Sequence, residues 1–167
     1  MVCTFWAGTS GTRSLAKSKS ILVLNGPNLN MLGVRQPEVY GRDSLADIAR
    51  ACAAEAKTLG LGVDFRQSNH EGELVTWIQE ARGRQAGIVI NPGAYGHTSI
   101  AILDALTLTE LPVIEVHLSN IHRREPFRHQ TYVSQIATGV ICGLGAQGYL
   151  LALQAMANLV NPKKARA

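Results

Sequence analysis

Lysine is nearly absent from the body of this 167-residue chain: between residues 21 and 160, Lys57 is the only one. It lies well inside a predicted helix, away from the ends of the predicted strands. An enzyme that works through a Schiff base needs a lysine amine within reach of a carbonyl substrate. The sequence therefore offers no obvious candidate for that mechanism.

Cysteine is equally scarce, with three residues in the chain: Cys3, Cys52 and Cys142. The number is odd and no CxxC spacing occurs, which argues against a disulfide framework and against a zinc site. The five histidines show no HExxH or comparable spacing either, so we expect no metal. Free cysteines suit a reducing compartment, and we expect a cytoplasmic protein. No apolar run approaches the roughly 20 residues that cross a bilayer, so we expect no membrane partner.

Acidic residues are missing from both ends of the chain. Residues 1–20 and 161–167 hold six of the 16 basic residues and none of the 12 acidic ones, so the body is slightly acidic. A nucleic-acid surface would gather its basic residues on a face of the domain, and we expect no nucleic-acid partner. We predict a flexible extension at 1–20, a single catalytic domain at 21–160 and a basic tail at 161–167. A targeting segment is the less favoured alternative for 1–20, because its apolar part precedes its charges.

From residue 21 onward, short apolar runs alternate with helical patterns. The runs are nearly continuous, as in strands that are buried on both faces of a parallel sheet. Five such units predict an α/β protein, a flavodoxin-like three-layer sandwich with a five-stranded parallel sheet of order 2-1-3-4-5. Ser44 and Asp47 have the spacing of a capping box at the first helix. We expect strands at 21–25, 61–67, 86–91, 112–118 and 139–143, helices at 44–60, 71–84, 99–109 and 146–160, and a loop with a short helical turn over 119–137.

Polar residues gather where the predicted strands end. In open parallel sheets, ligands bind outside the carboxyl ends of the strands, so these residues predict a binding site. His117 lies at the end of the fourth strand, and we expect a functional role for it. The strand ends read Asn25 to Asn28, Gln67 to His70, Asn91 to Gly93, and His117 to Asn120.

Several familiar chemistries fit poorly. GLGAQG at 143–148 matches the dinucleotide motif GxGxxG, but no strand follows its helix and no acidic residue lies about 20 positions on. A phosphorylation receiver would need acidic residues where Asn25 and Asn91 stand, and a flavodoxin would need a Ser/Thr-rich phosphate loop where NGPN stands. A tyrosine, a histidine, asparagines and arginines remain. That set suits proton transfer on an anionic, oxygenated small molecule without a metal or cofactor.

Four long segments resemble one family, the type II 3-dehydroquinate dehydratases. They are NGPNLNMLGVRQPEVYG at 25–41, INPGAYGHTSIAILDAL at 90–106, IEVHLSNIHRREPFRH at 114–129 and TGVICGLGAQGYLLAL at 138–153. The resemblance implies a flavodoxin-like, cofactor-free lyase that dehydrates 3-dehydroquinate to 3-dehydroshikimate in aromatic amino acid biosynthesis. It also implies a homo-oligomer, a dodecamer built from trimers. A role in quinate catabolism, or a non-catalytic ligand-binding module, stays open as an alternative.

The resemblance also implies roles for individual residues. Tyr40 would be the base that takes a proton from the carbon next to the ketone, and Arg35 would favour its ionised form. His117 would protonate the leaving hydroxyl, and Asn28 would hold a water that stabilises the enolate. The substrate would contact Asn91, His97, Leu118, Ser119 and Arg128, with Asp104 approaching from a neighbouring subunit. Val34 departs from the family pattern, because many relatives carry a second basic residue there.

Overall fold

The fold is a five-stranded parallel sheet of order β2-β1-β3-β4-β5. The computed structural model describes residues 19–33 and 43–162. The strands are β1 (Ser20–Asn25), β2 (Gly62–Gln67), β3 (Gly87–Asn91), β4 (Val113–His117) and β5 (Gly139–Cys142). The α-helices of the described part are α2 (Leu45–Thr58), α3 (Glu71–Ala81), α4 (Ile100–Thr109) and α5 (Gln147–Val160).

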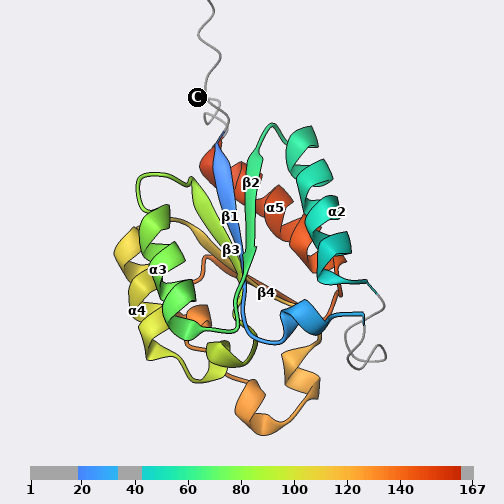
Figure 1. Cartoon of the computed structure of the whole chain (residues 1–167), viewed down its shortest axis with the longest axis vertical. Helices are drawn as coiled ribbons and strands as arrows, with labels where there is room; N and C mark the ends of the chain where they lie inside the picture. The colour runs from blue at the N-terminus through green and yellow to red at the C-terminus, as the bar shows by residue number, and fades with distance from the viewer. Residues whose placement is uncertain (1–18, 34–42, 163–167) are drawn as a thin grey trace, which may run out of the picture.

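Helices cover both faces of the sheet, as Figure 1 shows. Successive side chains of a strand point to opposite faces, and β1 supplies both cores in this way. Ile21 and Val23 pack in a core with residues of α2 and α5, whereas Leu22 and Leu24 pack in a second core with residues of α3 and α4. The predicted three-layer sandwich and strand order are therefore confirmed.

The predicted elements agree with the structure, with shifts at their ends. α2 begins after Ser44, whose hydroxyl accepts from the backbone N–H of Asp47 while the Asp47 carboxylate accepts from the backbone of Ser44, so the capping box is confirmed. α3 stops at Ala81 rather than at residue 84, because Arg82 leaves the helical conformation and Gly83 has a φ of 73°.

The long connection after β4 also differs from the prediction. The segment expected to hold a loop and one short helical turn contains three short 3-10 helices. They are η3 (Ile121–Arg123), η4 (Pro126–Arg128) and η5 (Val133–Gln135), and two more, η1 (Leu29–Met31) and η2 (Gly93–His97), follow β1 and β3.

The predicted extension and tail fall mostly outside the described residues and stay predictions. β1 begins at Ser20, one residue before the predicted boundary of the domain. The Lys19 ammonium donates to the backbone carbonyl of Val160, which ties the start of the sheet to the end of α5. No helix among the described residues has the length and apolar character needed to span a membrane.

The strands β1, β2 and β3 end level with one another. Asn25 pairs with Gln67 of β2 on one side and with Asn91 of β3 on the other. The contact continues past the ladder, because the N–H of Gly26 donates to the carbonyl of Asn91 at 2.8 Å. A Cβ atom at Gly26 would lie 2.2 Å from the carbonyl oxygen of Pro92, so only glycine fits this approach.

We expect Gly26→Ala to destabilise the protein, because backbone must move to accommodate the new methyl group. Overpacking of this kind costs about 1–3 kcal/mol of unfolding free energy, measurable by urea denaturation. Gly72→Ala in α3 is the control, since its Cβ would meet nothing within 4 Å. That variant should be as stable as the original or gain up to about 1 kcal/mol. Equal stability of the two variants would contradict the close approach.

Candidate active site

A pocket of about 290 Å³ opens at the carboxyl edge of the sheet. The segments after β1, β3 and β4 build it, which is where the strand ends predicted a site. Apolar residues of the segment after β1, among them Leu29 and Leu32, form part of its wall. The predicted site residues that line it are Asn28, Asn91, His97, His117, Leu118, Ser119 and Arg128.

Three predicted residues remain. Tyr40 and Arg35 lie outside the described residues, so their predicted roles stay predictions. Asp104 is exposed on α4 and is not among the residues around the pocket. This placement leaves open its predicted approach to the site of a neighbouring subunit.

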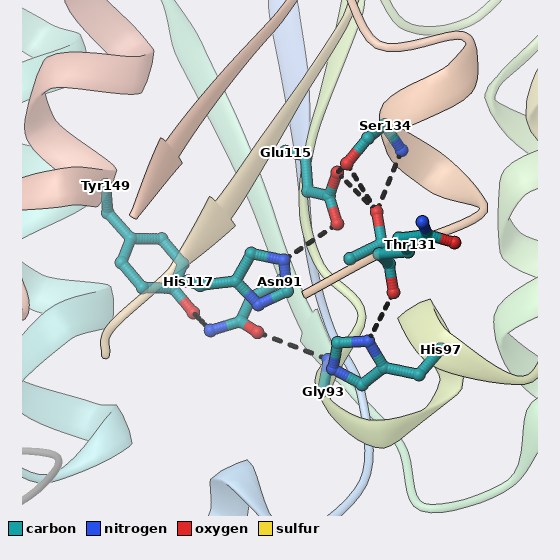
Figure 2. A network of polar contacts seen from close by, with 9 residues as sticks. Asn91, Gly93, His97, Glu115, His117, Thr131, Ser134 and Tyr149 are labelled. Atoms are coloured by element: carbon teal, nitrogen blue, oxygen red, sulfur yellow. Dashed lines mark hydrogen bonds and ion pairs between the residues drawn. The ribbon is translucent and has the colours of Figure 1, made fainter. Parts of the chain in front are cut away.

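His117 is held by a buried carboxylate that the sequence reading missed. Its Nε2 lies 2.7 Å from Oε1 of Glu115, whose residue is fully buried (Figure 2). Both residues come from β4, two positions apart, so their side chains project from the same face of the sheet. A carboxylate only accepts, so Nε2 carries a proton toward it. The other ring nitrogen, Nδ1, has no hydrogen-bond partner among the described residues.

Two hydroxyl groups complete the surroundings of Glu115. Thr131 and Ser134 donate to its Oε2 at 2.9 and 2.5 Å. Burial works to raise the pKa of the Glu115 carboxyl, but the hydrogen bonds from His117, Ser134 and Thr131 together hold that pKa below its ordinary value. Glu115 is therefore ionised near neutral pH. The buried carboxylate of Glu115 therefore holds the His117 ring in one orientation, with a proton on Nε2.

A second imidazole lies beside the first. The rings of His97 and His117 are stacked, with centroids 6.2 Å apart. Nδ1 of His97 lies 2.8 Å from the carbonyl of Gln130, which only accepts, so Nδ1 must carry the proton. Nε2 of a neutral His97 is then an acceptor, and it belongs to a residue of the pocket wall.

Asn28 occupies a special backbone position. Its φ of 66° is left-handed, which asparagine tolerates better than most residues. Its N–H donates to Oδ1 of Asn69 at 2.9 Å, and its carbonyl accepts from the N–H of Met31 at 3.1 Å. These bonds use the backbone of Asn28 alone. Its side-chain amide is thus available to a water or ligand in the pocket.

Positive charge lies at the rim of the pocket. Arg128, which was predicted, and Arg124, which was not, both line it. Nε of Arg128 donates to Glu125 at 3.0 Å, and its guanidinium lies 5.0 Å from the ring centre of Phe127. A guanidinium held in this way can present its remaining N–H groups to a carboxylate. The pair Arg123-Arg124 in the segment after β4 could have pointed to Arg124 from the sequence.

The described residues hold no group of three or more His, Cys, Asp or Glu that could bind a metal ion. What the pocket offers is an imidazole backed by a carboxylate, a second imidazole, amides and guanidinium groups. This arrangement can donate a proton to a leaving oxygen and bind a carboxylate and hydroxyl groups.

Comparisons with known proteins point in one direction. Residues 19–157 match the family model of dehydroquinase class II. A 3-dehydroquinate dehydratase 2 of Pseudomonas putida is 65% identical over 145 residues, which are 87% of this chain and 97% of the relative. A 3-dehydroquinate dehydratase of Streptomyces coelicolor is 62% identical over 93% of this chain and 99% of its own length. The crystal structure of type II dehydroquinase from Propionibacterium acnes superposes with a TM-score of 0.82 at 48% identity, covering 84% of this chain and 97% of that one.

The low pKa of Glu115 predicts a pH-dependent contribution to stability. Because the pKa is below its ordinary 4.5 in the folded protein, the contribution is fully present above pH 4.5 and is lost as the pH falls through the folded-state value. We expect Glu115→Gln to lose about 2 kcal/mol of unfolding free energy at pH 7, by urea denaturation.

That deficit should shrink at pH values below 4.5. Glu110→Gln is the control, because Glu110 is exposed and pairs with an exposed Arg82 at 3.1 Å. An exposed pair contributes little, so the control should lose under about 1 kcal/mol. A deficit of Glu115→Gln that is the same at pH 7 and at pH 3.5 would rule out the ionised carboxylate.

Proposed function

The chain belongs to the dehydroquinase class II family, and we propose that it dehydrates 3-dehydroquinate to 3-dehydroshikimate without a metal or cofactor. The observation that carries this proposal is the match of residues 19–157 to the family. Within the matched residues, the segments after β1, β3 and β4 together line one pocket. The pocket is lined by an imidazole, amides and guanidinium groups, which suit this reaction. We place the reaction in the shikimate pathway and, from the cysteine usage, in the cytoplasm.

The reaction is an elimination across two carbons. Tyr40, as the phenolate, takes the proton from the carbon next to the ketone, and the electron pair moves into an enolate. When the enolate collapses, a carbon–carbon double bond forms and the neighbouring carbon–oxygen bond breaks. His117 delivers a proton to the departing hydroxide, so that water leaves. A water held by the Asn28 amide donates to the enolate oxygen.

The pairing of His117 with Glu115 supports the assignment of the acid. Nε2 is occupied by the carboxylate at 2.7 Å, so Nδ1 is the nitrogen that can face a leaving group. A general acid must be aimed at its leaving group, and the bond to Glu115 fixes the orientation of the imidazole. Glu115 therefore acts through His117 as a positioning residue.

The base is assigned to a segment outside the described residues. An ordinary tyrosine has a pKa near 10, and a cation within about 4–6 Å lowers the pKa and raises the phenolate fraction. Arg35, five positions before Tyr40, supplies that cation in our proposal. The described residues nearest the segment support an action at this pocket. Leu32 lines the pocket itself, and Asp43 lines a hollow that shares Leu118 and Ser119 with it.

The remaining predicted residues bind the substrate in this proposal. Arg128 clamps the carboxylate, while Asn91, His97 and the backbone of Leu118 and Ser119 contact its carboxylate and hydroxyl groups. Their position in the wall of one pocket supports these roles.

We further propose a homo-oligomer, a dodecamer built from trimers, in which Asp104 reaches a neighbouring site. Asp104 lies on α4 between Ile100 and Leu108, two residues that are 55% and 62% exposed. Positions four apart share a face of a helix, so this carboxylate is flanked by exposed apolar groups. A subunit contact that buried them would carry Asp104 into the interface.

Turnover tests the proposal directly. The purified protein should convert 3-dehydroquinate to a product with the ultraviolet absorbance of a conjugated enone. Tyr40→Phe should lose at least about 100-fold in kcat, because general base catalysis contributes 10²–10⁴-fold, and should still bind the product. Tyr132→Phe is the control and should keep its turnover, since Tyr132 does not line the pocket. No rise in enone absorbance with the unaltered enzyme would refute the activity, and near-native turnover of Tyr40→Phe would exclude it as the base.

Borohydride separates the enolate route from a Schiff-base route. Reduction of an imine between substrate and lysine would inactivate an enzyme of the second type. We expect full activity after treatment with substrate and borohydride together, because Lys57, the only lysine between residues 21 and 160, lies in the last turn of α2. The control is the same treatment without substrate. Loss of activity that depends on substrate, with a matching mass increase on a lysine, would contradict the proposed chemistry.

A further inference from the structure

A line of buried polar side chains crosses the sheet beside the pocket. Tyr149 and Asn25 are fully buried, and Asn91 is 3% exposed. The Tyr149 hydroxyl donates to Oδ1 of Asn25 at 2.6 Å and accepts from Nδ2 of Asn91 at 2.9 Å. Burying polar groups is costly unless each finds a partner. Apolar side chains at these positions would avoid that cost, so we expect the buried polar groups to have a function.

The end of the line at Asn25 fixes which atom donates in each of its hydrogen bonds. Nδ2 of Asn25 donates to the backbone carbonyl of Arg66 at 3.0 Å, and a carbonyl only accepts. Oδ1 of Asn25 must therefore face Tyr149. A hydroxyl has one proton, and Tyr149 gives it to this oxygen. The Tyr149 oxygen is left as an acceptor, so the atom of Asn91 that faces it must be the NH₂ group.

The end of the line at Asn91 requires the same donors and acceptors. The backbone N–H of Gly93 donates to Oδ1 of Asn91 at 3.2 Å, and an N–H only donates. Figure 2 shows the Asn91 amide between Tyr149 and Gly93. Reversing it would set its NH₂ against the Gly93 N–H and its oxygen against the lone pairs of Tyr149. Asn91 and Gly93 both line the pocket.

We propose that Tyr149 and Asn25 are positioning residues that hold the Asn91 amide in one orientation, so that its oxygen is presented on the substrate side as an acceptor. The recognised group is a substrate hydroxyl that donates its proton to Oδ1. This inference rests on the proposed function, because it takes Asn91 as a contact of the substrate. Neither Tyr149 nor Asn25 touches the substrate, and both act through Asn91.

The line keeps its direction over the pH range in which enzymes work. Burial, which outweighs the opposing hydrogen bond from Asn91, raises the pKa of the Tyr149 phenol above its ordinary value. The hydroxyl therefore keeps the proton that it donates to Asn25. Amides do not titrate in this range, so no member of the line changes its donor or acceptor character.

Tyr149→Phe is the test, because it removes one oxygen and keeps the ring that packs in the core. Nδ2 of Asn91 then loses its partner, and the amide can turn. The hydroxyl contact exists in both the bound substrate and the transition state, so its loss raises KM and leaves kcat nearly unchanged. We expect KM for 3-dehydroquinate to rise about tenfold, as for one lost hydrogen bond, and kcat to stay within about threefold.

Two further variants separate positioning from a general loss of stability. Asn91→Ala should raise KM at least as much, and the double variant Tyr149→Phe/Asn91→Ala should be no worse than Asn91→Ala alone. Thr109→Val is the matched control: it also removes a buried hydroxyl, which donates to the carbonyl of Leu106 at 2.7 Å at the end of α4. It should lower the melting temperature and leave KM as it is.

The outcomes distinguish this inference from the proposed function. An unchanged KM in Tyr149→Phe, or additive effects in the double variant, overturns the positioning role while the activity stands. If the unaltered enzyme does not dehydrate 3-dehydroquinate, the proposed function fails first. The orientation is then judged from the crystal structure of Tyr149→Phe, where an Asn91 amide that has left the Gly93 N–H supports the role and an unmoved amide overturns it.

Discussion

The ends of β1 and β3 lie so close together that only a glycine fits between them. A Cβ at Gly26 would lie 2.2 Å from the Pro92 carbonyl oxygen, and the Gly26 N–H instead bonds the Asn91 carbonyl at 2.8 Å. This contact holds Asn25 beside Asn91, near enough for one tyrosine hydroxyl to bond both. It also brings Gly93, at a φ of 57°, against Pro27. The floor of the pocket, and the atoms that it presents, depend on that approach.

Two buried clusters, one around Glu115 and one around Tyr149, have a feature in common. The hydrogen bonds within each cluster are formed, and one atom of each remains to bind a ligand in the pocket. Glu115 is saturated by Thr131, Ser134 and His117, which leaves Nδ1 of the imidazole. The line through Tyr149 is anchored at both ends, which leaves an acceptor position on the amide oxygen of Asn91. A satisfied network is rigid, so neither group has to reorganise when charge develops.

The fold could be predicted because its determinants are local. β1 reads as a continuous apolar run, and the capping box at Ser44 marks the start of α2 within four residues. Asn28, Asn91 and His117 could be predicted from one topological rule, since strands end at the pocket. His97 and Arg128 were implied only by the family resemblance, because they lie in the connections beyond the strand ends. Glu115 was missed because VIEVH reads as an ordinary buried strand, although a charge in such a strand signals a paired site. Tyr149 was missed because an aromatic in an apolar helix reads as core, and its partners lie 58 and 124 positions away.

Two tyrosines have opposite requirements in the proposed mechanism. Tyr149 is useful only while it keeps its proton, and burial away from water ensures that it does. The base of the proposed reaction must lose its proton, which requires a neighbouring cation and access to the substrate. Separating the two tasks follows from electrostatics, because a phenolate at Tyr149 would face the amides of Asn25 and Asn91 and no cation among its partners in the described residues. Tyr149 and the amides that it orients therefore keep their protons near neutral pH, whereas our proposal assigns proton transfer to residues at the pocket.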